Sequence, residues 1–389
     1  MDESKQRPAE DTTAETEAAN TTAPVKVSVV MPIYNAKEYL LPALRGVQQQ
    51  TLSDIEIICV DDGSTDGCLK ALKELQKKDT RIRILTESNA GPAIARNKGL
   101  ARASGEYVMF LDADDLFDPK MLEILYREAK CKELDIAVCG YDLYRHLIGR
   151  FTDRNATVAP QAWLSGGVLS KSHCPETIFQ ITDGYIWNKL FSRKFLEEKG
   201  LRFMEDIRIF EDSLFVSMAL SLAERVGRVG DILIHQRVYR SQARQKLYRK
   251  YYMNVPAAAV CLKEFLMRHG MYLPLSKSYA NLSASQCYKM YRALGAEEEH
   301  AFFDYLHEHC EDLGWGENTP DAITDSDVSE FVANTEMYTY AQYSERKVRG
   351  RRLRLDKFIF FRRRLKRKEK VRSFFAKVFS FGRKKEKKK

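Results

Sequence analysis

Paired acids that follow apolar segments are the residues whose types and spacing most clearly suggest chemistry. Asp112 and Asp114 come directly after one apolar run and are separated by a single residue, and Asp61–Asp62 follows another. Two carboxylates at this spacing suit a hard divalent cation such as Mg²⁺ or Mn²⁺, which takes oxygen ligands and keeps positions open for phosphate. The alternative is a surface turn, because Asp is common in turns and before helices. Each pair taken alone leaves both interpretations open.

A further acidic pair, Glu211–Asp212, precedes the helix-like apolar segment 213–223. Acids at such a position can stabilise a helix N-terminus through the helix dipole. Tyr34 follows the first apolar run of the chain. Its ring could stack on a planar base, or it could simply be packed.

These residues need elements that bring them together, and the first part of the chain predicts an alternation of strands and helices. Short runs rich in β-branched residues alternate with segments whose apolar residues repeat at three and four. The predicted strands are 26–31, 55–60, 81–85, 106–111 and 135–140, and the predicted helices are 66–77, 91–103, 119–130 and one that contains Leu40, Leu44 and Val47. This alternation predicts an α/β fold with a mostly parallel sheet and helices on both faces. Ligands of such sheets lie beyond the carboxyl ends of the strands, where the acids fall.

Six sequence blocks, in a fixed order, carry a resemblance to a known family. They are Val27-Ser-Val-Val-Met-Pro-Ile-Tyr-Asn35, Val60-Asp-Asp-Gly-Ser-Thr-Asp66, Asn89-Ala-Gly-Pro-Ala-Ile-Ala-Arg-Asn97, Phe110-Leu-Asp-Ala-Asp-Asp115, Trp187-Asn-Lys-Leu-Phe191 and Phe210-Glu-Asp-Ser-Leu-Phe215. Over roughly residues 27–240 the chain resembles the family 2 glycosyltransferases. The resemblance implies a GT-A (Rossmann-like) fold, a nucleotide-diphosphate sugar donor, with a UDP-sugar as the default, and transfer with inversion at the anomeric carbon.

The resemblance also implies a role for particular residues. Tyr34 and Asp62 should hold the base of the nucleotide, Arg96 should lie near the diphosphate, and Asp112 should contact the ribose or the metal. Asp114 should ligate Mg²⁺ or Mn²⁺. Asp212 should be the general base, because a sugar hydroxyl is a poor nucleophile at neutral pH, with Glu211 orienting the loop or the acceptor. The alternative for this pair is stabilisation of the helix N-terminus, and both roles could hold together. The full donor-side set is Pro32, Tyr34, Asn35, Asp61, Asp62, Arg96 and Asp112.

Residues later in the chain are assigned to the acceptor side. Trp187, Asn188 and Lys189 should border the acceptor pocket, since aromatic faces stack on sugars and Asn and Lys offer donors; the alternative is a buried Trp that anchors a loop. His235 could ligate the metal but is more typical of a strand residue. Tyr239–Arg240 could touch the donor phosphates. The chain has no Gln-x-x-Arg-Trp block, which argues against a processive polymerase.

Charge divides the chain into an acidic body and a basic tail. The formal net charge is +9, yet residues 346–389 hold 22 Lys and Arg against three acids, which leaves 41 basic and 51 acidic residues before them. A uniformly basic nucleic-acid-binding surface is therefore excluded, and nucleic acid is not an expected partner. The eight cysteines are scattered without a CxxC pair, which indicates buried thiols in a reducing compartment.

The predicted organisation has four parts. Residues 1–24 read as a disordered acidic leader without the order of a signal peptide, 25–243 as the GT-A domain, 244–345 as a helical C-terminal subdomain, and 346–389 as a basic amphipathic tail. In the tail, Val371, Phe374, Phe375, Val378 and Phe379 share one helical face. This pattern fits an interfacial helix on an anionic membrane, although a solvated basic tail is the alternative.

Two hypotheses follow. The first is a metal-dependent inverting glycosyltransferase, cytoplasmic and peripheral on the inner face of the membrane, that transfers to a saccharide or lipid-linked acceptor in surface-polysaccharide assembly. The second is a non-catalytic sugar-nucleotide or polyanion-binding protein with the same fold. The intact pairs Asp112-x-Asp114 and Glu211–Asp212 favour the first.

Overall fold

The computed structural model describes residues 24–145, 150–152, 167–238, 242–316 and 322–346. The predicted leader, apart from its last residue, and the predicted membrane-associating tail from residue 347 onward lie outside the described residues. Tyr239 and Arg240 also lie outside them.

One sheet organises the first part of the chain, and its N-terminal half is parallel. It contains β1 (Val27–Ile33), β2 (Ile55–Asp61), β3 (Ile82–Thr86) and β4 (Tyr107–Phe110), paired in the order β3-β2-β1-β4. β2 and β4 are buried along their whole length, as expected for strands covered on both faces. The predicted strands are confirmed here to within one or two residues.

The other half of the sheet is mixed. β8 (Lys189–Ser192) runs antiparallel to both β4 and β6 (Ile136–Arg145), and β9 (Val226–Val238) runs parallel to β6. β5 (Leu116–Phe117) pairs antiparallel with β9, and β7 (Arg150–Thr152) pairs antiparallel with β6. The α/β class is confirmed, but the parallel character is confined to the β3-β2-β1-β4 half and to the β6–β9 pair.

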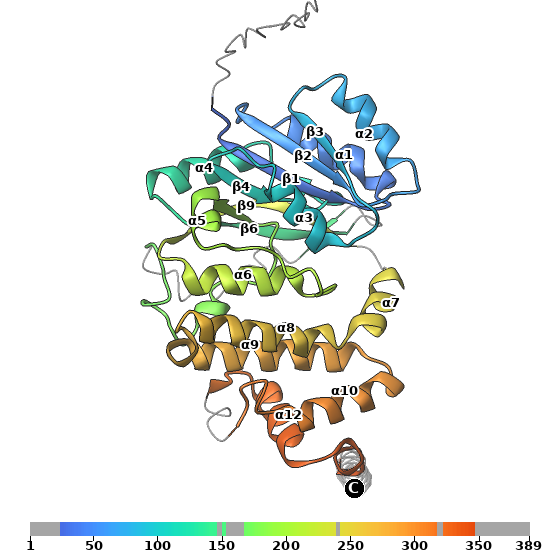
Figure 1. The fold of residues 1–389 in the computed structure, drawn as a ribbon, viewed down its shortest axis with the longest axis vertical. Helices are drawn as coiled ribbons and strands as arrows, with labels where there is room; N and C mark the ends of the chain where they lie inside the picture. Colours follow the sequence, from blue (N-terminus) through green and yellow to red (C-terminus); the bar gives the residue numbers. More distant parts are fainter. Residues whose placement is uncertain (1–23, 146–149, 153–166, 239–241, 317–321, 347–389) are drawn as a thin grey trace, which may run out of the picture.

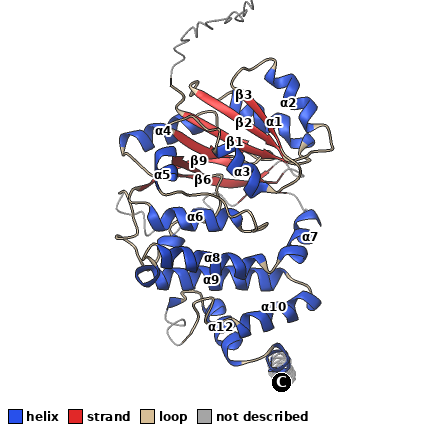
Figure 2. Cartoon of the chain, viewed as in Figure 1, coloured by secondary structure: helices blue, strands red, loops and turns tan. Residues whose placement is uncertain are grey.

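Helices cover both faces of this sheet, and the strands divide their side chains between two cores. Val29 and Met31 of β1 join one apolar cluster with α1 (Lys37–Gln48), α2 (Cys68–Gln76) and α4 (Met121–Cys131). Val30 points to the other cluster, with α3 (Pro92–Leu100), α5 (Arg193–Glu198) and α6 (Glu211–Leu222). The alternation follows from the two-residue period of a strand. The two-sided cover is visible in Figure 2.

The C-terminal part is helical and extends the molecule in layers. α6 lies below the sheet, packs on α8 (Asn254–Arg268), and α8 packs on α9 (Tyr272–Ala293), as Figure 1 shows. α9 also contacts α7 (Gln242–Tyr251), α10 (Ala296–Glu308) and α12 (Ser326–Met337), and the short helix η3 (Ile178–Gln180) contacts α6 and α9. Within the described ranges, none of the helices is both long and apolar enough to span a bilayer.

Candidate active site

The parallel strands bring the predicted donor-side residues to one edge of the sheet. β1 ends at Ile33 and β2 at Asp61, and these two residues are register partners, so Tyr34 and Asp62 leave the sheet side by side. Asp112 and Asp114 follow the end of β4, which is the other neighbour of β1. Pro32 lies within β1 opposite Val60. The strand-end prediction from the sequence therefore agrees with the geometry.

Tyr34 and Asn35 form the turn after β1. Asn35 adopts a left-handed backbone with φ of 48°, a conformation that Asn tolerates better than most residues. Its Oδ1 accepts the backbone N–H of Thr65 at 2.8 Å, which ties the two strand-end loops together. The Tyr34 side chain is 49% exposed, and its hydroxyl accepts a hydrogen bond from Asn89 Nδ2 at 2.9 Å. Tyr34 therefore offers a ring surface for stacking, whereas Asn35 acts on the loop.

Asp61 and Asp62 are both buried, and they do different things. The two carboxylate oxygens of Asp62 accept the backbone N–H groups of Ala90 and Gly91, at 2.6 and 2.8 Å. Asp62 thus fixes the loop that leads into α3. Among the described residues Asp61 Oδ1 has no hydrogen-bond partner although it is buried, which is costly for a carboxylate and typical of a site that receives a ligand or an ion.

A cluster of three carboxylates follows β4. One oxygen each of Asp112, Asp114 and Asp115 lie within 4.8 Å of one another. Burial, and then the charges of Asp114 and Asp112, raise the pKa of Asp115 well above its ordinary value. Three close acids with partly exposed members fit a hard divalent cation, which takes several carboxylate oxygens and would relieve their repulsion. The sequence reasoning named only Asp112 and Asp114; the third acid in the run Asp112–Asp115 was the signal for Asp115.

Arg237 of β9 holds two members of this carboxylate cluster in place, and the sequence did not predict it. Its backbone N–H donates to Asp115 Oδ1 at 2.8 Å, and its Nε donates to the backbone carbonyl of Asp114 at 2.7 Å. Its guanidinium lies 5.3 Å from the ring centre of Tyr39. The contact exists because β5 pairs with β9, more than a hundred residues away in the chain. No local sequence pattern predicts the pairing of β5 with β9.

Arg96 links the carboxylate cluster to the second acidic pair. The residue is 5% exposed, its Nη2 lies 3.1 Å from Asp112 Oδ1, and its Nη1 lies 2.8 Å from Glu211 Oε1. The resemblance placed Arg96 near the donor diphosphate. The structure shows its cation between two carboxylates of the chain itself, on the ring of Phe203 at 5.5 Å.

Glu211 and Asp212 open α6 beside Arg96. The preceding Phe210 has φ of 65°, an uncommon left-handed conformation for a bulky residue and one that occurs at functional sites. Asp212 Oδ1 accepts the backbone N–H of Ser213 at 2.7 Å. Burial, and then the charge of Glu211, raise the pKa of Asp212 to about 7. This places Asp212 in the range suited to a general base at neutral pH. Both acids lie in the first turn of α6, so the helix-stabilising interpretation holds as well.

Trp187, Asn188 and Lys189 do not border an open pocket. All three are buried at 2% exposure or less. Asn188 donates to the carbonyl of Cys139, and Lys189 Nζ donates to two carbonyls and to Asn188 Oδ1. The expectation that these two polar side chains donate to an acceptor is therefore wrong for this structure, because no part of either reaches the surface. The alternative, a buried Trp that anchors a loop, fits.

His235 lies in β9 opposite Leu116 of β5, and its Nδ1 is 2.6 Å from Asp142 Oδ1. It is a strand residue with a carboxylate partner, as the sequence favoured.

A mixed sheet of this order, with acids at the carboxyl ends of its strands, is the GT-A class of glycosyltransferase fold. The family model for "Glycosyl transferase family 2" matches residues 28–198. That part of the chain is a family 2 glycosyltransferase domain, and it contains the predicted donor-side residues and the carboxylate cluster.

Curated relatives agree with this assignment. The chain is 37% identical over 204 residues to the uncharacterized glycosyltransferase EpsJ of Bacillus subtilis, covering 51% of this chain and 57% of EpsJ. It is 32% identical over 212 residues to the cholesterol galactosyltransferase of Borreliella burgdorferi, covering 53% and 58%. The chain thus spans a little over half the length of these relatives.

Among solved structures, the chain resembles S. aureus TarS 1-349 in complex with UDP-GlcNAc. The TM-score is 0.61 at 18% identity, and the likeness covers 80% of this chain and 87% of TarS 1-349. At this identity the likeness concerns the fold, and it includes much of the helical C-terminal part.

Proposed function

We propose that this chain is a metal-dependent, inverting glycosyltransferase. It moves a hexosyl or N-acetylhexosaminyl group from a nucleotide-diphosphate sugar to a hydroxyl of a saccharide or lipid-linked acceptor, in surface-polysaccharide assembly. The observation that carries the proposal is the Arg96 bridge. One buried guanidinium contacts both Asp112 of the carboxylate cluster and Glu211 beside the candidate base, so a site for the leaving group and a site for the nucleophile adjoin.

The residues divide the work of a single displacement. The exposed ring of Tyr34 stacks on the nucleotide base. Asp61 Oδ1, which has no partner among the described residues, offers an acceptor oxygen, and Asp62 holds the loop that leads into α3. Asp112, Asp114 and Asp115 would hold Mg²⁺ or Mn²⁺, and the ion would supply positive charge for the departing nucleoside diphosphate. Asp212 takes the proton of the acceptor hydroxyl as it attacks. With one base and no covalent intermediate, the anomeric centre inverts.

UDP-sugars are the donors to test first. The fold neighbour TarS was solved with UDP-GlcNAc, and a relative at 32% identity is a galactosyltransferase that acts on cholesterol, so hexosyl and N-acetylhexosaminyl donors and lipid acceptors belong in the panel. The measurement is release of nucleoside diphosphate from each sugar nucleotide, with Mn²⁺, with Mg²⁺ and with chelator. Release that requires a metal and increases with acceptor supports the proposal.

The base assignment has its own variant. Asp212→Asn should abolish transfer and leave donor binding largely intact, because the carboxylate is replaced by a side chain of the same shape that takes no proton. The same substitution at the exposed Asp206 is the control and should leave transfer unchanged. Near-normal turnover of Asp212→Asn would remove Asp212 from the base role. Donor binding without turnover of any donor would instead favour the non-catalytic sugar-nucleotide-binding protein.

The peripheral membrane position is a separate proposal. It rests on the basic and aromatic sequence from residue 346 onward and on the electrostatic attraction of such segments to anionic leaflets, about 1 kcal/mol for each basic residue near the surface. The test is sedimentation with anionic vesicles. The full chain should bind and a chain ending at Glu345 should not; equal binding of the two would refute it.

A further inference from the structure

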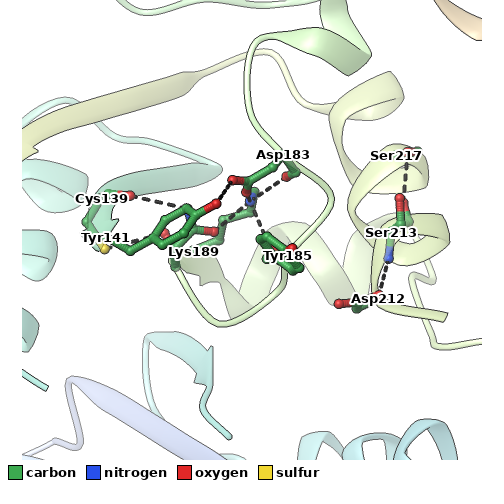
Figure 3. Close-up of polar contacts among 9 residues, drawn as sticks. Cys139, Tyr141, Asp183, Tyr185, Lys189, Asp212, Ser213 and Ser217 are labelled. Atoms are coloured by element: carbon green, nitrogen blue, oxygen red, sulfur yellow. Dashed lines mark hydrogen bonds and ion pairs between the residues drawn. The ribbon is translucent and has the colours of Figure 1, made fainter. Parts of the chain in front are cut away.

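The loop Asp183–Tyr185 lies against the start of α6, where the candidate base stands (Figure 3). A Cβ atom on Gly184 would collide with Ser213 Oγ, so the loop and α6 are in direct contact. Ser213 donates its backbone N–H to Asp212 Oδ1 and receives a hydrogen bond on its Oγ from Gln286 of α9 at 2.6 Å. The loop therefore contacts Ser213, and Ser213 in turn orients the carboxylate of the candidate base Asp212.

Lys189 shapes this loop from inside the protein. Its Nζ is buried and donates to the carbonyls of Asp183 and Tyr185 at 2.9 and 2.6 Å, and to Asn188 Oδ1 at 2.7 Å. These contacts are drawn in Figure 3. A buried ammonium is tolerated only when its donors are satisfied and a counter-charge is near, and Asp183 Oδ1 lies 3.7 Å away. The protein thus places a costly cation where its bonds hold the two ends of one short loop.

The surface of the loop combines an aromatic ring with a carboxylate. The Asp183 side chain is 25% exposed, and Tyr185 is partly exposed, in contrast to the buried residues 186–190. Both are held in place: Tyr185 stacks on Trp187 with ring centres 4.9 Å apart, and Tyr141 donates its hydroxyl to Asp183 Oδ2 at 2.7 Å. Asp183 Oδ1 is buried on the side of Lys189, so the oxygen that a ligand would use is Oδ2, which can accept a second hydrogen bond beside that of Tyr141. A fixed ring and a fixed acceptor oxygen on one short loop suit a sugar, whose apolar face packs on the ring while a hydroxyl donates to the oxygen.

We propose that Asp183 and Tyr185 form the acceptor subsite, which takes a saccharide ring beside Asp212, and that Lys189 is the positioning residue of this subsite. The inference rests on the proposed glycosyltransferase function and moves the acceptor contacts from Trp187–Lys189 to the loop that those buried residues support.

The test compares Tyr185→Leu with a matched control in the full chain. Tyr126 is also a partly exposed tyrosine, with an edge contact to the ring of Tyr107 and a hydroxyl that donates to the carboxylate of Glu106. These partners lie at the start of β4, whereas the candidate site lies beyond the end of this strand, so Tyr126 is remote from the site. Tyr185→Leu, Tyr185→Phe and Tyr126→Leu are assayed for nucleoside diphosphate release with p-nitrophenyl glycosides as acceptors. Tyr185→Leu should raise the acceptor KM about tenfold, the worth of a good aromatic contact, while the donor KM and acceptor-independent donor hydrolysis change less than about twofold.

Tyr185→Phe should keep the wild-type acceptor KM because the ring remains, and so should Tyr126→Leu. An unchanged acceptor KM in Tyr185→Leu, or an equal rise in Tyr126→Leu, would overturn the proposal. Saturation-transfer NMR with the same glycosides separates this proposal from the glycosyltransferase function. A saturation-transfer signal on the sugar protons that is lost in Tyr185→Leu and kept in Tyr126→Leu supports the subsite even if no donor turns over. A signal that persists in Tyr185→Leu, or that is absent in the wild type, refutes the subsite.

Discussion

The acid limb of the pH–rate profile should report the ionisation of Asp212. Burial, followed by the charge of Glu211, raises the pKa of Asp212 from 3.8 to about 7. A general base works only when it is deprotonated, so activity should fall with pH below 7 and not near pH 4. One unit below its pKa, about a tenth of a carboxyl group is ionised. We therefore expect kcat/KM at pH 6 to be about a tenth of its plateau.

Glu211→Gln tests the cause of this shift. Removing the negative neighbour favours the ionised form of Asp212, so its pKa should fall and the acid limb should move to lower pH. A like charge on a neighbouring carboxylate typically raises a pKa by about one to two units, so the acid limb should move by about that much. The plateau should also fall, because Arg96 loses one of its two carboxylate partners. Glu198→Gln, on an exposed carboxylate of α5, is the control and should shift nothing.

The assay is nucleoside diphosphate release between pH 5 and 9, at saturating Mn²⁺ and subsaturating acceptor at every pH. A kcat/KM that stays at its plateau between pH 7 and pH 5 in the wild type would refute the assignment of Asp212 as a base with a raised pKa. An identical midpoint in Glu211→Gln would show that Glu211 does not contribute to the shift.

Three further predictions concern charge. Arg96→Met leaves Asp112 and Glu211 without their shared cation and should lower the free energy of unfolding by about 3–5 kcal/mol, measured in urea; Arg96→Lys should recover only part, since an ammonium lacks the planar fork. Asp114→Asn should weaken Mn²⁺ binding about tenfold or more in calorimetry, because affinity follows the number of charged ligands; unchanged binding would remove Asp114 from the metal site. Burial lowers the pKa of Lys189 to about 8, so the folded state releases this proton before the unfolded state does and stability rises with pH from about 8 to 10.5. Wild type should therefore gain about 2 kcal/mol relative to Lys189→Met between pH 7.5 and 9.5, and a constant difference between the two proteins would contradict the shift.

The sequence predicted what short-range patterns encode. Apolar runs indicate where the strands lie. Because neighbouring parallel strands end at one edge of the sheet, the sequence alone predicts that the acids after β2 and β4 lie close together. Arg237 escaped prediction because its contact with Asp115 depends on antiparallel pairing between β5 and β9, which no local periodicity specifies.

Lys189 escaped prediction for a different reason. Lysine is almost never fully buried, so the sequence favours an exposed Lys189 side chain that can reach a ligand. Its burial follows from the loop that packs around it, and this packing is a tertiary property. The sequence also did not predict the ion pair between Arg96 and Glu211, because the two residues lie 115 positions apart in the chain.

That separation has a consequence for engineering. Arg96 belongs to the segment that carries the donor-side residues, and its partner Glu211 belongs to the segment that carries the candidate base. A chimaera that joins the first half of this protein to the second half of a relative would place this buried guanidinium opposite a foreign side chain. Exchanging acceptor preference between such enzymes should therefore succeed only when the incoming segment brings an acid to the position of Glu211, so this one ion pair sets where the protein can be cut and recombined.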